Sequence, residues 1–231
     1  TLRATDLEIG VVMHYPAEII EEGSCLLNSK NIYEAIREFP HAIIDVIKLE
    51  NNWVKISSGK IFFNLIGLDS REYPKVPEFK KKISFNFPGH TLLEMINKTI
   101  FSIGKDTSRQ NLNGCYIEKK EINGKKIIRF VSTDGHRLSL IDREIDDWDK
   151  IVFTKNIIVP RKGFVEIKKA LEENVEPCDL SLDDNHLIFS GKNIVILMRL
   201  IDGKFPDYTK VIPLNNDKVA LIYDSLSNSK I

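Results

Sequence analysis

Ser29-Lys30-Asn31-Ile32-Tyr33-Glu34 and Arg161-Lys162-Gly163-Phe164-Val165-Glu166 are two similar stretches of this chain that begin 132 residues apart. Further matches follow in the same order: Ser58-Gly59-Lys60 with Ser190-Gly191-Lys192, Tyr73-Pro74 with Phe205-Pro206 and, 128 residues apart, Thr5-Asp6 with Thr133-Asp134. A shared order and a nearly constant separation predict an internal repeat. Two similar β-meanders with common turn residues are the alternative interpretation.

The pattern within each repeat predicts helices followed by antiparallel strands. Apolar residues at helical spacing predict three helices, at 30–39, 89–104 and 161–173. Asn123-Gly124 is the strongest hairpin signal, and it is expected to join strands at 115–121 and 126–132. The strands outnumber the helices and follow one another too closely for βαβ crossovers. The predicted fold class is therefore α+β with antiparallel sheets.

Local composition divides the 231 residues into structural units. The Pro- and Lys-rich stretch from Tyr73 to Lys82 is typical of a connector, and 205–216 occupies the same place one repeat later. We expect one unit at 1–80, a second at 81–213 and the start of a third at 214–231. Thr1 is not an initiator methionine, so we expect the chain to be a fragment.

Charge, apolar runs and cysteine content exclude several classes of protein. The 33 Lys and Arg residues balance the 33 Asp and Glu residues, which excludes a globally basic nucleic-acid binder but not a local basic face. The longest apolar runs, such as 194–198, are far shorter than the ~20 residues that span a bilayer. Cys25, Cys115 and Cys178 lack metal-ligand spacing, so we expect no metal, no cofactor, no disulfide scaffold and a cytoplasmic location.

One predicted helix carries a local excess of positive charge. Residues 161–169 hold four basic side chains against one acidic side chain, whereas 142–149 hold five acidic residues and one arginine. Equivalent helices of the repeat are therefore candidates for a basic face that contacts phosphate groups. Ordinary solvated helix faces are the alternative. Because no motif that reads base edges is present, any contact is expected to be with the nucleic-acid backbone.

Ser132-Thr133-Asp134-Gly135-His136-Arg137-Leu138 is the most distinctive stretch. Asp134 and His136 lie two residues apart, so on a strand they would share a face and could perform acid–base chemistry, for instance in a small hydrolase. Gly135 between them favours a turn, and no other histidine or carboxylate cluster completes a triad. The stretch 101–107 superficially resembles a phosphate-binding loop, but its helix precedes the glycine instead of following it.

Four motifs make the chain resemble a known family: Leu112-Asn113-Gly114, Ser132 to Leu138, Ile158-Val159-Pro160-Arg161-Lys162-Gly163 and Gly203-Lys204-Phe205-Pro206-Asp207-Tyr208. In sequence, order and spacing they resemble the bacterial DNA sliding clamp, the β subunit of DNA polymerase III. The resemblance covers essentially the whole chain. It implies a non-enzymatic protein whose repeated clamp domains form a homodimeric ring around DNA, with antiparallel sheets outside and helices lining a central hole.

The resemblance also implies site residues. It places a pocket for short linear peptides of the DNA polymerase III α subunit, the clamp loader and repair polymerases at Leu112, Thr133, Gly135, His136, Arg137, Leu138, Pro206, Lys210 and Val211. It places residues that face double-stranded DNA, without sequence preference, at Lys30, Lys98, Lys105, Arg109, Gln110, Asn111, Arg161, Lys162 and Lys168. Thr209-Lys210 replaces two arginines that members often carry, and Gln110-Asn111 replaces DNA-contacting aromatics. A peptide-binding adaptor that forms no ring is the remaining hypothesis.

Overall fold

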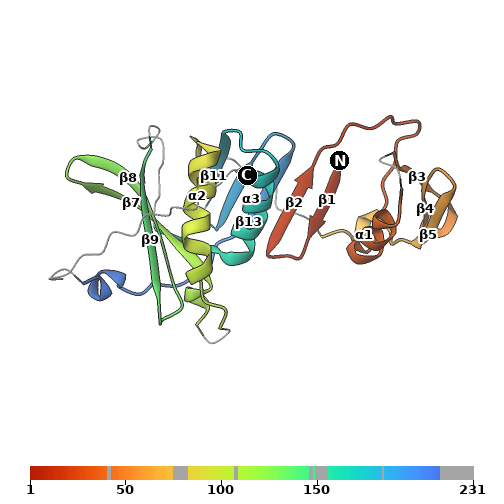
Figure 1. The fold of residues 1–231 in the computed structure, drawn as a ribbon. Helices are drawn as coiled ribbons and strands as arrows, with labels where there is room; N and C mark the ends of the chain where they lie inside the picture. Colours follow the sequence, from red (N-terminus) through yellow and green to blue (C-terminus); the bar gives the residue numbers. More distant parts are fainter. Residues whose placement is uncertain are drawn as a thin grey trace, which may run out of the picture.

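The computed structural model describes residues 1–40, 43–74, 83–106, 109–145, 148, 156–183 and 185–213. In this part of the chain, antiparallel strands form three sheets, and three α-helices pack against or beside them (Figure 1). The predicted α+β class with antiparallel sheets is confirmed. The expected third unit at 214–231 lies outside the described residues.

The first repeat consists of one helix and a three-stranded meander. Helix α1 (Ser29–Arg37) begins where Asn28 Oδ1 accepts hydrogen bonds from the backbone nitrogens of Lys30 and Asn31, at 3.0 and 3.3 Å. The meander contains β3 (Asp45–Lys48), β4 (Trp53–Ser58) and β5 (Ile61–Ile66) in the order β3-β4-β5. Gly59, with φ +59°, forms the tight turn between β4 and β5.

The second repeat has the same elements in the same order. Helix α3 spans Arg161–Glu173, and its strands are β11 (Cys178–Leu182), β12 (His186–Ser190) and β13 (Ile194–Arg199). Both helices and the last two hairpin strands correspond at the predicted separation of 132 residues. The structure therefore confirms the repeat.

A six-stranded sheet joins the two repeats. Its order is β1-β2-β13-β12-β11-β6, in which β1 is Leu2–Thr5, β2 is Ile9–Met13 and β6 is Ile83–Phe87. Strand β2 pairs antiparallel with β13, from Ile9 opposite Met198 to Met13 opposite Ile194. Sheet hydrogen bonds thus connect residues near position 10 with residues near position 195, a pairing that the sequence analysis did not anticipate.

A four-stranded sheet of order β10-β7-β8-β9 forms the other side of the second unit. Its strands are β7 (Gly114–Ile122), β8 (Lys125–Thr133), β9 (Leu138–Glu144) and β10 (Ile157–Pro160). Asn123 and Gly124 have φ of +52° and +78°, as a two-residue hairpin with the right-handed strand twist requires. The predicted hairpin is confirmed, since both expected strands lie within β7 and β8.

Helices α2 (Gly89–Thr99) and α3 run side by side in the middle of the molecule (Figure 1). Helix α2 packs on β8 and β9, α3 packs on β10 and β13, and their apolar faces join one core cluster. The rings of Phe130 on β8 and Phe164 on α3 stack at 5.5 Å. Gly163 allows α3 to approach the sheet, because a Cβ at this position would lie 2.5 Å from Met198 Sδ.

Helix α2 is shorter than the sequence predicted, and a 3₁₀ turn at Ile100–Ser102 follows it. The carbonyl of Thr99 accepts a 2.6 Å hydrogen bond from the Ser132 hydroxyl, while the Gly104 N–H donates to the Leu112 carbonyl at 2.9 Å. These backbone groups are therefore engaged outside the helix. The predicted end at residue 104 is wrong, because tertiary hydrogen bonds compete with the helical ones.

Candidate functional site

Strands β8 and β9 are joined by a compact loop at Thr133–Arg137, named here the central turn. Thr133 Oγ1 accepts from the Gly135 N–H at 3.0 Å and donates to the Arg137 carbonyl at 2.7 Å. Asp134 Oδ1 accepts from the N–H groups of His136 and Arg137 at 3.0 and 3.1 Å. Gly135 has φ +92°, so its lack of a Cβ matters here. Two adjacent side chains thus hold the whole loop.

The Asp134 carboxylate is occupied with the backbone and with one guanidinium. Hydrogen bonds from the N–H groups of His136 and Arg137 and from the Arg137 side chain hold the pKa of Asp134 at about 2. Arg137 Nε donates to Asp134 Oδ2 at 3.0 Å. No hydrogen bond joins this carboxylate to the imidazole of His136 in the described part of the chain. The geometry therefore assigns Asp134 to turn stabilisation and gives the hydrolase hypothesis no support.

An apolar cluster lies beside the central turn. Leu112 and Phe205 are 5% and 6% exposed, and the half-buried Leu138 packs against their cluster. The ring of Tyr116 on β7 stacks on Phe205 at 4.9 Å. The structure therefore brings together Leu112 and Leu138, which belong to the predicted pocket, from segments far apart in sequence.

The segment after β13 forms the rim of this cluster. Phe205 and Tyr208 are buried, whereas Pro206, Lys210 and Val211 are exposed, with Val211 68% exposed. Lys210 forms an ion pair with Asp207 at 3.4 Å. An exposed aliphatic side chain next to a buried aromatic cluster offers a surface that a ligand could cover.

A polar network anchors the rim segment, and the sequence analysis missed it. The Tyr208 hydroxyl donates to the Glu118 carboxylate and accepts from Lys120 Nζ at 3.0 Å and from Arg129 Nη1 at 3.2 Å. Arg129 also donates twice to the Asp142 carboxylate, at 2.7 Å each. Register places Glu118 opposite Arg129 and Arg129 opposite Asp142 on three adjacent strands. Only knowledge of that register could have revealed the network.

The loop at 109–113 connects the rim with the central turn. Asn111 Nδ2 donates to the Lys204 carbonyl at 3.0 Å, and a Cβ on Gly135 would lie 3.0 Å from Arg109 Nη1. Arg109 and Gln110 are exposed, as are Lys98 on α2 and Lys105 after it. The predicted DNA-facing residues of this loop thus lie next to the predicted peptide pocket, and their role stays a prediction.

The basic residues of α3 have acidic neighbours. Lys162 Nζ contacts Glu8 Oε2 at 2.6 Å and Asp6 Oδ2 at 3.4 Å, and Lys168 contacts Glu172 at 3.5 Å. Over its full length, α3 carries four basic and three acidic side chains. Lys30 on α1 likewise lies 3.9 Å from Glu34. Each of these pairs is largely exposed to solvent, so a phosphate group could compete for the cations at little cost.

Other chemistry has little representation in the described residues. They contain no group of three or more His, Cys, Asp or Glu side chains placed to hold a metal ion, and no helix long and apolar enough to cross a membrane. Cys25, Cys115 and Cys178 are free thiols, and burial raises the pKa of Cys115 and Cys178 to about 12. These two thiols are therefore poor nucleophiles.

Comparison with known proteins identifies the family. The family described as DNA polymerase III beta subunit, N-terminal domain, matches residues 1–77, and the corresponding central domain matches residues 86–207. The beta sliding clamp of Haemophilus influenzae is 31% identical over 95% of this chain and 58% of its own length. That of Bacillus subtilis is 30% identical over 90% and 56%.

Solved structures give the same result. A sliding clamp from Bartonella birtlesii bound to griselimycin superimposes with a TM-score of 0.85 at 29% identity, covering 93% of this chain and 57% of that one. The Caulobacter crescentus clamp gives 0.83 at 30% identity, covering 94% and 58%. The chain thus spans somewhat under three fifths of the length of these relatives. It belongs to the family of the DNA polymerase III beta subunit, the bacterial sliding clamps.

Proposed function

We propose that this chain is part of a DNA sliding clamp, a non-catalytic ring that encloses duplex DNA and tethers a polymerase to it. The observation that carries this proposal is the match of two successive clamp domains, in order, to almost the whole chain. The fold agrees at a TM-score of 0.85. A protein topologically linked to DNA keeps its partner at high effective concentration without tight binding.

The six-stranded sheet supports a ring. A closed ring needs stiff connections between successive domains, and the pairing of β2 with β13 supplies main-chain hydrogen bonds across the boundary. With the clamp domains at 1–80, 81–213 and 214–231, a complete homodimer would repeat this type of connection around the circumference.

The paired charges of α1 and α3 support sliding. A clamp must hold DNA weakly and without sequence preference, so its contacts should be with phosphate groups and should exchange easily. Lys162 and Lys168 in their exposed ion pairs fit this need, because each can leave a carboxylate for a phosphate and return. A face of unpaired cations would bind DNA more tightly and slow its movement.

The central turn and the rim segment support a peptide-docking site. Leu138 and the aromatic cluster supply apolar surface, while His136, Arg137 and Lys210 supply polar contacts at the edge. Short linear peptides of the DNA polymerase III α subunit, the clamp loader and repair polymerases are the proposed ligands. Griselimycin, which is bound in the structure of the Bartonella birtlesii relative, provides a ready probe of this site.

The proposal is tested on the full-length protein, loaded by its clamp loader onto nicked circular DNA and then linearised. We expect retention on circles and escape from linear ends, because enclosure fails when an end is available. Loading is verified beforehand by isolating the protein–circle complex. The Lys168→Glu variant should leave circles faster than the wild type at 0.15 M salt, and the Lys210→Glu variant, changed outside the helices, is the matched control. Equal retention on circular and linear DNA would exclude enclosure.

A further inference from the structure

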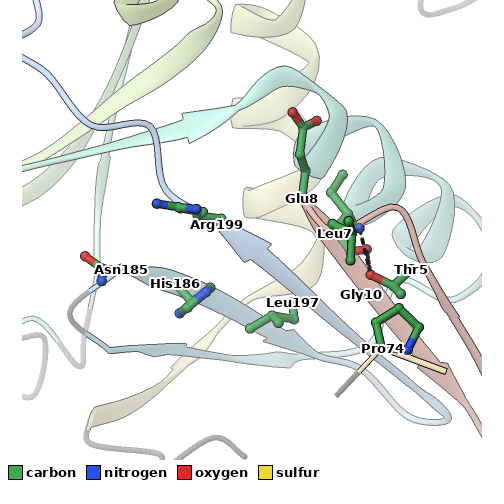
Figure 2. A pocket seen from close by; sticks show the side chains of 10 residues that line it. Thr5, Leu7, Glu8, Gly10, Pro74, Asn185, His186, Leu197 and Arg199 are labelled. Carbon is green, nitrogen blue, oxygen red and sulfur yellow. Dashed lines mark hydrogen bonds between the residues drawn. The ribbon is translucent and has the colours of Figure 1, made fainter. Parts of the chain in front are cut away.

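A second cavity lies where the two repeats meet. Its volume is about 300 Å³, and its walls come from the loop between β1 and β2, from Pro74 and from the β12–β13 hairpin (Figure 2). The loop between β1 and β2, Thr5–Ile9, is named here the N-terminal turn. A volume this small accommodates a few side chains of a peptide better than a large cofactor.

One side of the cavity is apolar. Leu7, Pro74 and Leu197 line it, and Figure 2 shows them on the same side of the pocket. Leu7 is 77% exposed and has φ +74°, a backbone conformation that side chains with a Cβ rarely adopt. The fold gains no burial from this leucine. A ligand that covered it would remove its apolar surface from water.

The opposite side is polar and carries a cation. Arg199, Asn185 and His186 gather there (Figure 2), and Arg199 is exposed. In the described part of the chain, its guanidinium has no hydrogen bond or ion pair, although its backbone N–H donates to the Glu8 carbonyl at 3.0 Å. The Glu8 side chain is engaged by Lys162 at 2.6 Å. Arg199 is therefore available to a carboxylate from outside.

The N-terminal turn repeats the central turn bond for bond. Thr5 Oγ1 accepts from the Leu7 N–H at 3.0 Å and donates to the Ile9 carbonyl at 2.9 Å. Asp6 Oδ1 accepts from the N–H groups of Glu8 and Ile9 at 3.0 and 2.8 Å. Pro74 lies one repeat before Pro206, so the same loop and the same proline border both the junction cavity and the proposed peptide site.

From this geometry we infer that the junction cavity is a second docking site for an extended peptide. An aliphatic side chain of the peptide contacts Leu7, Pro74 and Leu197, and an adjacent carboxylate pairs with Arg199. The inference rests on the proposed function in one respect, the role of the central turn as a peptide site. The apolar and cationic sides of the cavity support it independently.

The test uses the full-length protein and a fluorescent, photoreactive hexapeptide containing Leu-Leu-Asp. A second probe carries Asn in place of Asp. Crosslinked residues are mapped by mass spectrometry, and affinity is measured by fluorescence anisotropy. We expect crosslinks near Leu7 and Leu197 for the Asp probe. Leu7→Gly, which suits the positive φ, should reduce crosslinking there about tenfold. Arg199→Gln should reduce it about fivefold for the Asp probe and little for the Asn probe.

Ile20→Gly is the matched control, because Ile20 is 95% exposed and lies outside both turns. Its crosslinking should equal that of the wild type. Crosslinks at the central turn alone would overturn this inference and leave the proposed function intact. Crosslinks at neither turn would overturn both this inference and the peptide-binding part of the proposed function. Junction crosslinks that survive Leu7→Gly and Arg199→Gln would also overturn it.

Discussion

The N-terminal turn and the central turn have the same backbone hydrogen bonds and present different surfaces. In both, a threonine hydroxyl and an aspartate carboxylate satisfy the loop, and both third residues have positive φ. That third residue is Leu7 in one turn and Gly135 in the other. The comparison teaches that Thr-Asp specifies the loop, while the three residues after it determine what the loop offers to a ligand.

The neighbourhoods of the two turns differ as well. Asp6 lies 3.4 Å from Lys162 on α3, so the N-terminal turn is connected to the second repeat. Asp134 pairs with Arg137 inside its own turn. The N-terminal turn thus borders a junction between repeats, whereas the central turn borders an aromatic cluster of its own unit.

A reciprocal exchange of the third residue gives the largest expected effects, of opposite sign. Gly135→Leu should lower the free energy of unfolding by about 1–2 kcal/mol, because leucine is strained at φ +92°. Leu7→Gly should raise it by up to about 1 kcal/mol, because the strain disappears while little burial is lost. Urea unfolding of the full-length protein measures both. Ile20→Gly controls for the flexibility of glycine, and changes of the same sign in both turns would break the comparison.

The repeat, the three helices and the Asn123-Gly124 hairpin could be predicted because their signals are local. Strand pairing could not: β2 with β13 and β6 with β11 join residues far apart, and no local pattern selects those partners. The junction cavity depends on the first of these pairings, so the sequence analysis found Thr5-Asp6 only as a mark of the repeat. The resemblance supplied Leu112 and Leu138, but not the Tyr208 network, which depends on register.

Removal of the threonine hydroxyls should affect both turns equally. Thr5→Val and Thr133→Val keep the shape of the side chain and delete two hydrogen bonds each. Each variant should lose about 1 kcal/mol of unfolding free energy, since water partly replaces bonds at half-exposed sites. The measurement is again urea unfolding. A markedly larger cost in one turn would mean that the two loops are alike in geometry but not in energetics.

Acid titration should distinguish the turns by the smallest effect. The N–H groups of His136 and Arg137 hold the pKa of Asp134 at about 2, against an ordinary 3.8. For Asp6, partial desolvation opposes the shift, but the N–H groups of Ile9 and Glu8 and the Lys162 ammonium outweigh it and lower the pKa. A lowered folded-state pKa stabilises the fold above pH 4, and this contribution is lost as the pH falls from about 4 to about 2.

Asn preserves the side-chain oxygen that accepts the backbone hydrogen bonds and removes the titration. Asp134→Asn should therefore melt close to the wild-type temperature at pH 7 and lose less stability than the wild type between pH 4 and pH 2. Asp6→Asn should show the same change with a smaller amplitude, because the pKa of Asp6 is less displaced. Thermal melts from pH 2 to pH 7 measure both. A steeper acid loss in Asp134→Asn than in the wild type would show that the carboxylate does not hold this turn by its charge.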